Sequence, residues 1–475
     1  MFLTITDSVA LARRRALRDG FLFFMEYKCY NHRMKKTAVR SNSSNLQIEG
    51  GRKLHGTIET NSSKNGAVVL LCASLLNRGT TTLKRMPKIE EVNRLIEVLQ
   101  SIGMKITWKN RDLHIIPPKK YDLKNINVVS AKKTRSIIMF VGPLAHLFKK
   151  FSIPQSGGCK LGSRTIYPHL LALKKLGITI ETREQSFVVT NKKLHSAEII
   201  LSEAGDTATV NTLLVASKIK GTTTIKYASA NYQVQEVCFF LQKLGVSING
   251  IGTSTLIVKG VSEINKPIEY TVSEDPGDAM FFITAAILTK SAITITRCPI
   301  EFLEMELGTL KQMNFRCQQS KTYFSHNGHT KLVDIKTFPS KLIAPTDKIH
   351  SLPYPGLNID NLPFFAIIAT QAKGQTLIHD WVYEKRAIYY ADIDRFGATT
   401  VLADPHRFFV TGPTKLTPAE LVCPPALRPA TIILIAMLGA EGTSILRNTY
   451  SINRGYEDLV NRLNSLGAKV RILEE

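Results

Sequence analysis

Short runs of β-branched residues recur along this sequence, and each is followed by a polar turn and a stretch with helical periodicity. The unit predicted by this pattern is a strand, a turn, an amphipathic helix, a glycine and a second strand. It occurs six times, with copies that begin at Gly79, Cys159, Gly221, Ser291, Gly374 and Gly442.

Within each copy, the apolar residues of the middle segment lie on one face of a helix. Val92, Leu95, Ile96 and Leu99 of the first copy have the spacing i, i+3, i+4 and i+7. Each helix is expected to stop at a glycine with a left-handed backbone, and Asn314 takes that place in the fourth copy.

A second set of segments is apolar nearly all round, which predicts helices buried on every side. These segments are residues 67–76, 136–147, 210–217, 279–288, 362–371 and 430–438. Three units in each half of the chain predict an α/β fold of two similar domains, with the apolar helices inside and the sheets outside. A site between two such domains would be closed by a hinge motion.

The length of 475 residues, with 44% apolar and 21% charged residues, is typical of a globular protein of two or more domains. The longest apolar runs, residues 136–148 and 431–438, are too short to span a bilayer, so we expect a soluble protein without a membrane partner. Residues 1–45 contain an arginine cluster but no signal-peptide pattern, and they predict a poorly ordered extension.

The net charge of +24 is compatible with nucleic acid, an anionic membrane surface or phosphorylated small molecules as partners. The lysines are spread as pairs and form no long basic run. This distribution favours a solvated surface over a nucleic-acid interface.

The seven cysteines include no C-x-x-C pair, which argues against a zinc site or a disulfide scaffold. Cys72 and Cys238 lie in apolar helical patterns, where cysteine behaves as a small hydrophobic residue. Cys159, in SGGCKLGSR (residues 156–164), is flanked by glycines and followed by Arg164. By itself this stretch is either a mobile loop with a reactive thiol or a flexible turn.

Two further positions carry candidate chemistry at predicted helix starts. Lys64 and Asn65 open a buried helix, and a cation at that end of a helix dipole is unfavourable unless an anion binds there. Asp360 precedes another buried helix, so it is either a functional carboxylate or an N-cap.

Four stretches together resemble one known family. They are LQIEGGRKLHGTIETNSSKNGA (46–67), MPKIEEV (86–92), SGGCKLGSR (156–164) and INRGYEDLVNRLNSLGA (452–468). From Leu46 onward the chain resembles the enolpyruvyl transferases. The resemblance implies an inside-out α/β barrel with one domain of residues 64–273 and another of residues 46–63 plus 274–475, and no metal or organic cofactor.

The members that it resembles most transfer the enolpyruvyl group of phosphoenolpyruvate to the 3-hydroxyl of UDP-N-acetylglucosamine and release phosphate, by addition and then elimination. The resemblance therefore implies a cytoplasmic transferase of peptidoglycan precursor synthesis, with these two small molecules as substrates and the antibiotic fosfomycin as an inhibitor. It says nothing about oligomeric state.

The resemblance also assigns expected roles to residues. Cys159 is the expected general acid, which can also form a covalent adduct with phosphoenolpyruvate, and Asp360 is the expected base. Lys64 is expected to be catalytic and, with Arg164 and Arg454, to bind phosphoenolpyruvate, while Asn65 and Arg135 would face the sugar nucleotide. Arg386 and Arg428 match family arginines near the closed site.

Three departures from the family pattern concern the acceptor. Tyr167 and Ala426 stand where the family has aspartates, and Asp206 adds a negative charge where the diphosphate is expected. The alternatives are an enolpyruvyl transferase with a different acceptor, including 5-enolpyruvylshikimate-3-phosphate synthase, or a nucleic-acid-binding protein similar to RNA 3'-terminal phosphate cyclase.

Overall fold

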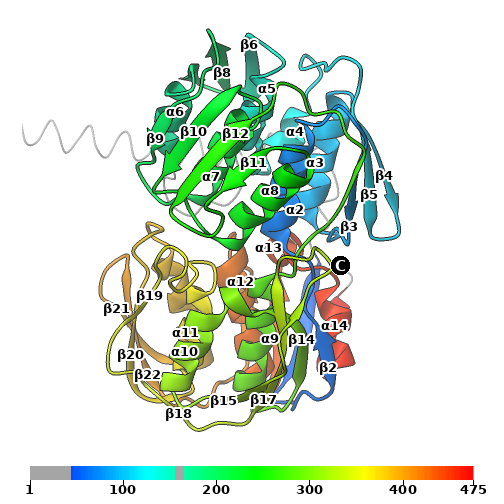
Figure 1. The fold of residues 1–475 in the computed structure, drawn as a ribbon. Coiled ribbons are helices and arrows are strands. Elements are labelled where there is room, and N and C mark those ends of the chain that lie inside the picture. The colour runs from blue at the N-terminus through cyan, green and yellow to red at the C-terminus, as the bar shows by residue number, and fades with distance from the viewer. Residues whose placement is uncertain (1–43, 156–164, 474–475) are drawn as a thin grey trace, which may run out of the picture. The chain divides into compact units, whose positions relative to one another are not determined.

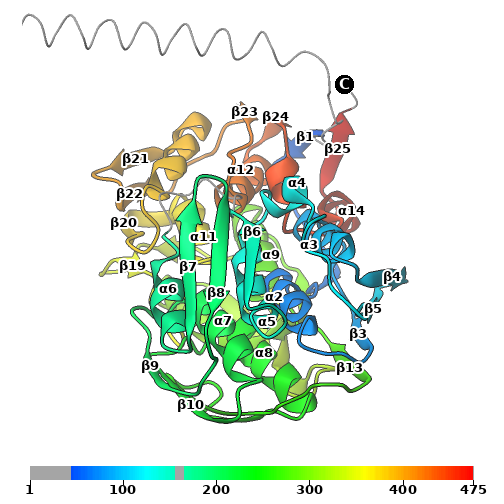
Figure 2. The same ribbon diagram turned by 90° about the horizontal axis from the view of Figure 1, so that it is seen from above.

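The computed structural model describes residues 44–155 and 165–473 (Figures 1 and 2). The predicted extension of residues 1–45 therefore lies almost entirely outside the described residues, as do Cys159 and Arg164. Residues 44–475 group into one compact unit.

In the described chain, the strands form six sheets, one for each repeat. Three sheets have the strand orders β13-β3-β5-β4, β6-β8-β7 and β11-β12-β10-β9. Their strands are β3 (Thr81–Lys84), β4 (Lys105–Lys109), β5 (Asp112–Ile116), β6 (Lys150–Pro154), β7 (Ile178–Arg183), β8 (Ser186–Asn191), β9 (Glu198–Ile200), β10 (Gly221–Lys226), β11 (Ser247–Asn249), β12 (Thr255–Gly260) and β13 (Ile268–Thr271). We call these sheets and their helices the first lobe.

The other three sheets and their helices form the second lobe, with orders β23-β24-β1-β25, β15-β17-β14-β2 and β18-β20-β22-β21. Its strands are β1 (Asn45–Gly50), β2 (Thr57–Glu59), β14 (Thr294–Pro299), β15 (Arg316–Gln319), β16 (Tyr323–Phe324), β17 (Lys331–Phe338), β18 (Leu342–Ile343), β19 (Ile349–His350), β20 (Ala372–His379), β21 (Thr399–Leu402), β22 (Arg407–Gly412), β23 (Glu420–Val422), β24 (Gly442–Arg447) and β25 (Lys469–Leu473). Strand β1 lies between β24 and β25, pairing Leu46 with both Leu446 and Ile472, so the sequence-distant ends of the lobe share one sheet (Figure 2).

The helices of the first lobe are α2 (Lys64–Ser74), α3 (Glu90–Ser101), α4 (Val128–Ala131), η1 (Ser136–Phe140), α5 (Val141–Leu144), α6 (Tyr167–Lys174), α7 (Asp206–Ala216) and α8 (Tyr232–Lys243). Those of the second lobe are α9 (Pro276–Leu288), η2 (Ile300–Phe302), α10 (Glu304–Gln312), α11 (Leu362–Ala369), η3 (Ala387–Phe396), α12 (Leu427–Gly439), α13 (Tyr450–Asn453) and α14 (Leu459–Ser465). The η elements are 3-10 helices.

The helices that are apolar nearly all round lie at the centre of each lobe, as predicted. Every residue of α9 and α11 is buried, and α9, α11 and α12 pack against one another. In the first lobe α2, α7 and η1 have the same position, and the sheets flank these helices (Figure 1). The described residues thus contain two hydrophobic cores, one per lobe. The predicted arrangement of helices inside and sheets outside is confirmed, whereas the exact domain boundaries remain a prediction.

The predicted helix stops are also confirmed. Each of the six positions after a repeat helix has a positive φ, namely Gly103, Gly177, Gly245, Asn314, Gly397 and Gly467. Two details differ from the sequence pattern. The helix of the fifth repeat is the 3-10 helix η3, and the first strand of the second repeat is β6, which precedes residues 156–164.

Two chain segments in the described residues connect the lobes, and they pair with each other. Ser63 N donates to Ser273 O at 2.7 Å, and Asp275 N donates to Asn61 O at 2.8 Å. Ser62 and Glu274 form an antiparallel bridge between these two bonds. Each segment then leads directly into a buried helix, the first into α2 and the second into α9.

Candidate functional site

A cavity of about 750 Å³ is lined by residues of both lobes. All seven predicted site residues that the structure describes line it: Lys64, Asn65, Arg135, Asp360, Arg386, Arg428 and Arg454. Thr165 and Ile166, which directly follow residues 156–164, line it as well. The predicted roles of these residues remain predictions, but the fold brings together side chains that lie up to 390 positions apart in sequence.

Lys64 reaches the cavity because a capped helix begins at this position. Ser63 is the N-cap of α2, and its hydroxyl accepts the N–H of Gly66 at 2.9 Å. The N–H of Lys64 donates to the carboxylate of Asp275 at 2.9 Å. The capped turn fixes where the lysine leaves the helix.

A buried carboxylate organises the cations on one side of the cavity. Arg454 Nη2 lies 2.7 Å from Glu91 Oε2, and the hydroxyl of Thr134 donates to Glu91 Oε1 at 2.6 Å. Burial raises the pKa of Glu91, but Lys64 and Arg454 outweigh burial and lower it. Arg454 thus forms an ion pair with this carboxylate and Lys64 acts on it at longer range. Two cations and one anion leave a net positive charge suited to an anionic ligand.

Asp360 faces groups from both lobes. Its Oδ2 lies 3.6 Å from Nη2 of Arg428 and 3.5 Å from the amide nitrogen of Asn65. The alternative that Asp360 caps the following helix is wrong, because the N-cap of α11 is Asn361 and no side-chain cap bond forms there. Asp360 therefore lies at the cavity without a helix-capping role.

Arg428 is a buried cation with several phenol and carboxylate neighbours. Its Nη1 donates to the hydroxyl of Tyr456 at 2.8 Å. Burial lowers the pKa of Arg428, but Tyr456, Asp360 and Asp275 outweigh burial and raise it. A side chain at Gly277 would place its Cβ 2.6 Å from Arg428 Nη2, so only a glycine lets the guanidinium approach this closely.

Asn65 links the start of α2 to the first turn of α8. Its amide donates to the hydroxyl of Tyr232 at 2.8 Å, in addition to the longer contact with Asp360. Burial, together with Asp275 and Asp360, raises the pKa of Tyr232 well above its usual value, so this phenol stays neutral. The asparagine is held with its amide group toward Asp360.

Arg386 has a structural partner of its own. Its Nε and Nη2 bind the two oxygens of Asp380 at 2.5 and 2.9 Å, and Tyr390 donates to the same carboxylate at 2.5 Å. Arg386 and Asp380 are both 0% exposed. Among the described residues, Nη1 of Arg386 has no hydrogen-bond partner. Two of the three guanidinium nitrogens of Arg386 therefore bind Asp380 and stabilise the fold.

The three residues that differ from the family pattern on the acceptor side, Tyr167, Ala426 and Asp206, lie in different environments. Tyr167 is the first residue of α6 and is 55% exposed, and Ala426 is the buried N-cap residue of α12. Asp206 lines the cavity, where its carboxylate accepts bonds from Ser229 at 2.5 Å and Asn231 at 3.2 Å, with a third bond from the Gln233 amide. Burial raises the pKa of Asp206 to about 6. The extra carboxylate is thus engaged by neighbouring donors.

The cysteines of the apolar helices behave as predicted. Cys72 and Cys238 are 0% exposed, and burial raises the pKa of Cys238 to about 12. Burial also raises the pKa of Cys72. These thiols pack as hydrophobic groups and are not reactive at neutral pH.

Sequence reasoning missed three residues that shape the cavity. Glu91 and Tyr456 lie inside the family-like stretches MPKIEEV and INRGYED but received no role. The available signal for Glu91 was its position on the apolar face of the predicted helix, four residues before Leu95 and seven before Val98. Nothing in the sequence marked Tyr232, because its role depends on Asn65 from a distant segment.

Residues 44–155 and 165–473 contain neither a metal-binding cluster nor a membrane-spanning helix. No group of three or more His, Cys, Asp or Glu side chains is arranged to hold a metal ion there. None of the helices in this part of the chain is long and apolar enough to cross a membrane.

A family model described as EPSP synthase (3-phosphoshikimate 1-carboxyvinyltransferase) matches residues 48–463. Among curated proteins, the UDP-N-acetylglucosamine 1-carboxyvinyltransferase of Treponema denticola is 33% identical over 90% of this chain and 99% of its own length. The proteins of the same name from Bacteroides thetaiotaomicron and Bradyrhizobium diazoefficiens are 32% and 30% identical over 89% and 90% of this chain, and over 98% of their own lengths.

Solved structures share the fold at lower sequence identity. The enolpyruvyl transferase NikO from Streptomyces tendae superposes with a TM-score of 0.78 at 22% identity, covering 91% of this chain and 99% of its own. EPSP synthase from Acinetobacter baumannii superposes with a TM-score of 0.71 at 18% identity, covering 91% of this chain and 100% of its own. These comparisons do not favour the alternative prediction of a nucleic-acid-binding protein similar to RNA 3'-terminal phosphate cyclase. This chain belongs to the enolpyruvyl transferase family, as a divergent carboxyvinyl transferase with the inside-out α/β fold.

Proposed function

We propose that this protein transfers the enolpyruvyl group of phosphoenolpyruvate to the 3-hydroxyl of UDP-N-acetylglucosamine and releases phosphate, in peptidoglycan precursor synthesis. The names of its relatives support this acceptor. The single observation that carries the proposal is the lining of one cavity by seven residues that were predicted from the family pattern. The reaction needs no redox group, since the enolpyruvyl unit moves without a change of oxidation state overall.

The donor would bind at the cations around Glu91. Phosphoenolpyruvate carries a phosphate and a carboxylate, and guanidinium groups bind both kinds of oxyanion through paired hydrogen bonds. Arg454 already pairs with the Glu91 carboxylate, Lys64 acts on the same carboxylate electrostatically, and Arg164 is the third predicted cation. An incoming phosphate would take over part of the interaction that Glu91 now makes with Arg454.

The first step would be an addition to the double bond. Cys159 gives its proton to the methylene carbon, which becomes a methyl group. The 3-hydroxyl oxygen of the sugar forms a bond to the central carbon, and Asp360 takes the hydroxyl proton. The product of this step is a tetrahedral adduct that still holds the phosphate.

The second step would be an elimination from that adduct. A base removes one proton from the methyl group, the carbon–oxygen bond to phosphate breaks, and the double bond forms again. The cations stabilise the charge that develops on the departing phosphate. The enol ether of the sugar nucleotide and inorganic phosphate then leave the cavity.

Phosphate release from phosphoenolpyruvate tests the proposal directly. We expect release that depends on UDP-N-acetylglucosamine, and little release with shikimate 3-phosphate or with a sugar nucleotide whose 3-hydroxyl is absent. The Asp360→Asn variant is the matched control, because it keeps the size of the side chain. Release with another acceptor alone would contradict the proposed acceptor, and no release with any acceptor would contradict the transferase reaction.

A further inference from the structure

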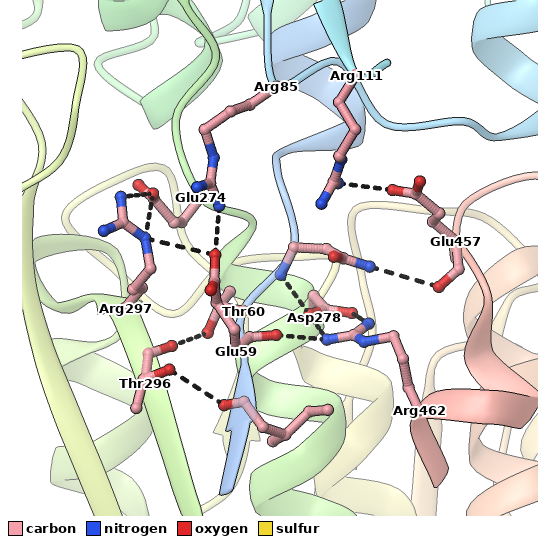
Figure 3. A network of polar contacts seen from close by, with 12 residues as sticks. Glu59, Thr60, Arg85, Arg111, Glu274, Asp278, Thr296, Arg297, Glu457 and Arg462 are labelled. Atoms are coloured by element: carbon pink, nitrogen blue, oxygen red, sulfur yellow. Dashed lines mark hydrogen bonds and ion pairs between the residues drawn. The ribbon is translucent and has the colours of Figure 1, made fainter. Parts of the chain in front are cut away.

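An ion pair outside the cavity joins the two lobes near the donor site. Arg111 follows Asn110 at the tip of the β4–β5 hairpin, where Asn110 has a left-handed backbone with φ of 57°. The Nη2 of Arg111 donates to Oε2 of Glu457 in the second lobe at 2.8 Å (Figure 3). The side chain of Arg111 is 41% exposed and that of Glu457 is 16% exposed.

Glu457 belongs to the short segment that follows α13 and carries Arg454. Side chains from elsewhere hold three residues of this segment. Arg454 binds Glu91 of the first lobe at 2.7 Å, Tyr456 accepts from Arg428 at 2.8 Å, and Glu457 accepts from Arg111. Two of the three ties thus reach the first lobe, one on each side of Gly455.

The segment has little room to shift within its surroundings. A Cβ at Gly455 would lie 2.4 Å from Cδ2 of Leu427 and 3.3 Å from Cδ of Lys64. The N–H groups of Gly455 and Tyr456 both donate to Ile452 O at 3.0 Å, so the turn between Arg454 and Glu457 is closed. A displacement of Glu457 would therefore also displace Arg454 from its present position near Lys64.

We propose that Arg111 is a positioning residue for the donor site, which holds Arg454 in place through Glu457. Arg111 does not line the cavity, so it acts through the segment and not by touching the substrate. This inference rests on the proposed function, because it assumes that Arg454 binds an anionic group of phosphoenolpyruvate. Of the neighbouring contacts, the two hydrogen bonds from Arg462 to Asp278, at 2.7 and 2.8 Å, stay within the second lobe. The ion pair of Arg85 with Glu59 also crosses between the lobes, but it does not involve the segment of Arg454 (Figure 3).

The test measures initial rates at varied concentrations of each substrate for Arg111→Gln, Glu457→Gln and the double variant. A part-exposed ion pair is worth at most about fivefold in an equilibrium constant, so we expect each single change to raise KM for phosphoenolpyruvate about two- to fivefold. The kcat and the KM for UDP-N-acetylglucosamine should stay the same, since uniform binding of the donor is what is lost. The double variant should be no worse than either single one.

Two further variants separate positioning from a general structural role. Arg111→Glu alone should raise the KM for phosphoenolpyruvate, and the reversed pair Arg111→Glu with Glu457→Arg should bring this KM part of the way back to the wild-type value. Lys415→Gln removes the exposed ion pair of Lys415 with Glu441, whose atoms lie 3.0 Å apart, and should change neither KM. A wild-type KM in Arg111→Gln, or an equal rise of both KM values with a lowered melting temperature, would overturn the inference. A wild-type protein that releases no phosphate would instead overturn the proposed function itself.

Discussion

The carboxylate of Asp275 accepts the backbone N–H of Lys64 at 2.9 Å and so joins the starts of two helices from different lobes. Its other oxygen accepts the N–H of Gly277 in the first turn of α9 at 2.8 Å. The first N–H groups of a helix have no partner inside the helix, and one buried carboxylate supplies a partner to each helix here. The start of α2, from which Lys64 enters the cavity, is therefore tied to the second connection between the lobes.

We expect Asp275→Asn to destabilise the fold and to weaken donor binding. The amide nitrogen would face one of the two N–H groups and leave it without an acceptor, at a cost of about 1–3 kcal/mol. Urea unfolding monitored by circular dichroism measures the loss, and KM for phosphoenolpyruvate reports the displacement of Lys64. Asp122→Asn, at an exposed turn, is the control. An unchanged unfolding midpoint in Asp275→Asn would contradict the double-capping role.

Cys159 is expected to react with fosfomycin and to be needed for turnover. Loss of a general acid typically lowers kcat about 10²- to 10⁴-fold, so Cys159→Ser should lose this much phosphate release. Mass spectrometry of digested protein should place the adduct on Cys159. Cys317 is the partly exposed control among the described cysteines, and Cys317→Ser should still be labelled. An adduct on Cys317, or none at all, would contradict the assignment of the reactive thiol.

Asp360→Asn should lower kcat about 10²- to 10⁴-fold while leaving stability nearly unchanged. The substitution removes the proposed base, but it does not remove a helix cap, since Asn361 holds that position. Steady-state kinetics and a thermal melt on the same preparation separate the two effects. A variant with normal kcat would show that another group takes the hydroxyl proton.

Glu236 should make the stability of the protein depend on pH. Burial raises its pKa from 4.5 to about 7, although its bonds with Ser273 partly offset the effect. The folded protein then holds a proton that the unfolded chain loses near pH 4.5, so the free energy of unfolding falls as the pH rises from about 4.5 to about 7. The full effect is about 3 kcal/mol at pH 8.

In the wild-type protein the N–H of Ser273 donates to Glu236 at 3.0 Å. Glu236→Gln removes the titration and keeps an acceptor for this N–H. Chemical unfolding at a series of pH values gives the difference between wild type and variant, in which the titration of other groups cancels. We expect the variant to gain stability relative to wild type as the pH rises through this range. Parallel curves for the two proteins would contradict the raised pKa.

Much of the fold could be predicted, because it depends on local patterns that repeat. The apolar faces of α3 and the all-apolar α9 and α11 follow from the spacing of their residues, and these residues are buried as expected. The 3-10 geometry of η3 could not be predicted, since the amphipathic pattern of residues 387–396 fits an α-helix equally well. Tertiary contacts decide between the two geometries.

The cavity could be predicted only in part, because individual residues were recognised but their partners were not. Nothing in the sequence indicated that Arg454 binds Glu91 or that Asp206 is held by Ser229 and Gln233. Such pairs join segments far apart in the chain, and their geometry depends on how the lobes fold. The capping alternative for Asp360 was likewise decided by a one-residue difference in where α11 begins.

The position of β1 between β24 and β25 has a consequence for synthesis on the ribosome. The first lobe is built from one uninterrupted stretch, so its core can form as soon as that stretch has emerged. Strand β1 emerges earlier than any of it, yet its two neighbours are made last. Strand β1 therefore stays without its sheet neighbours until residues 442–473 have been synthesised, and the second lobe is completed only then.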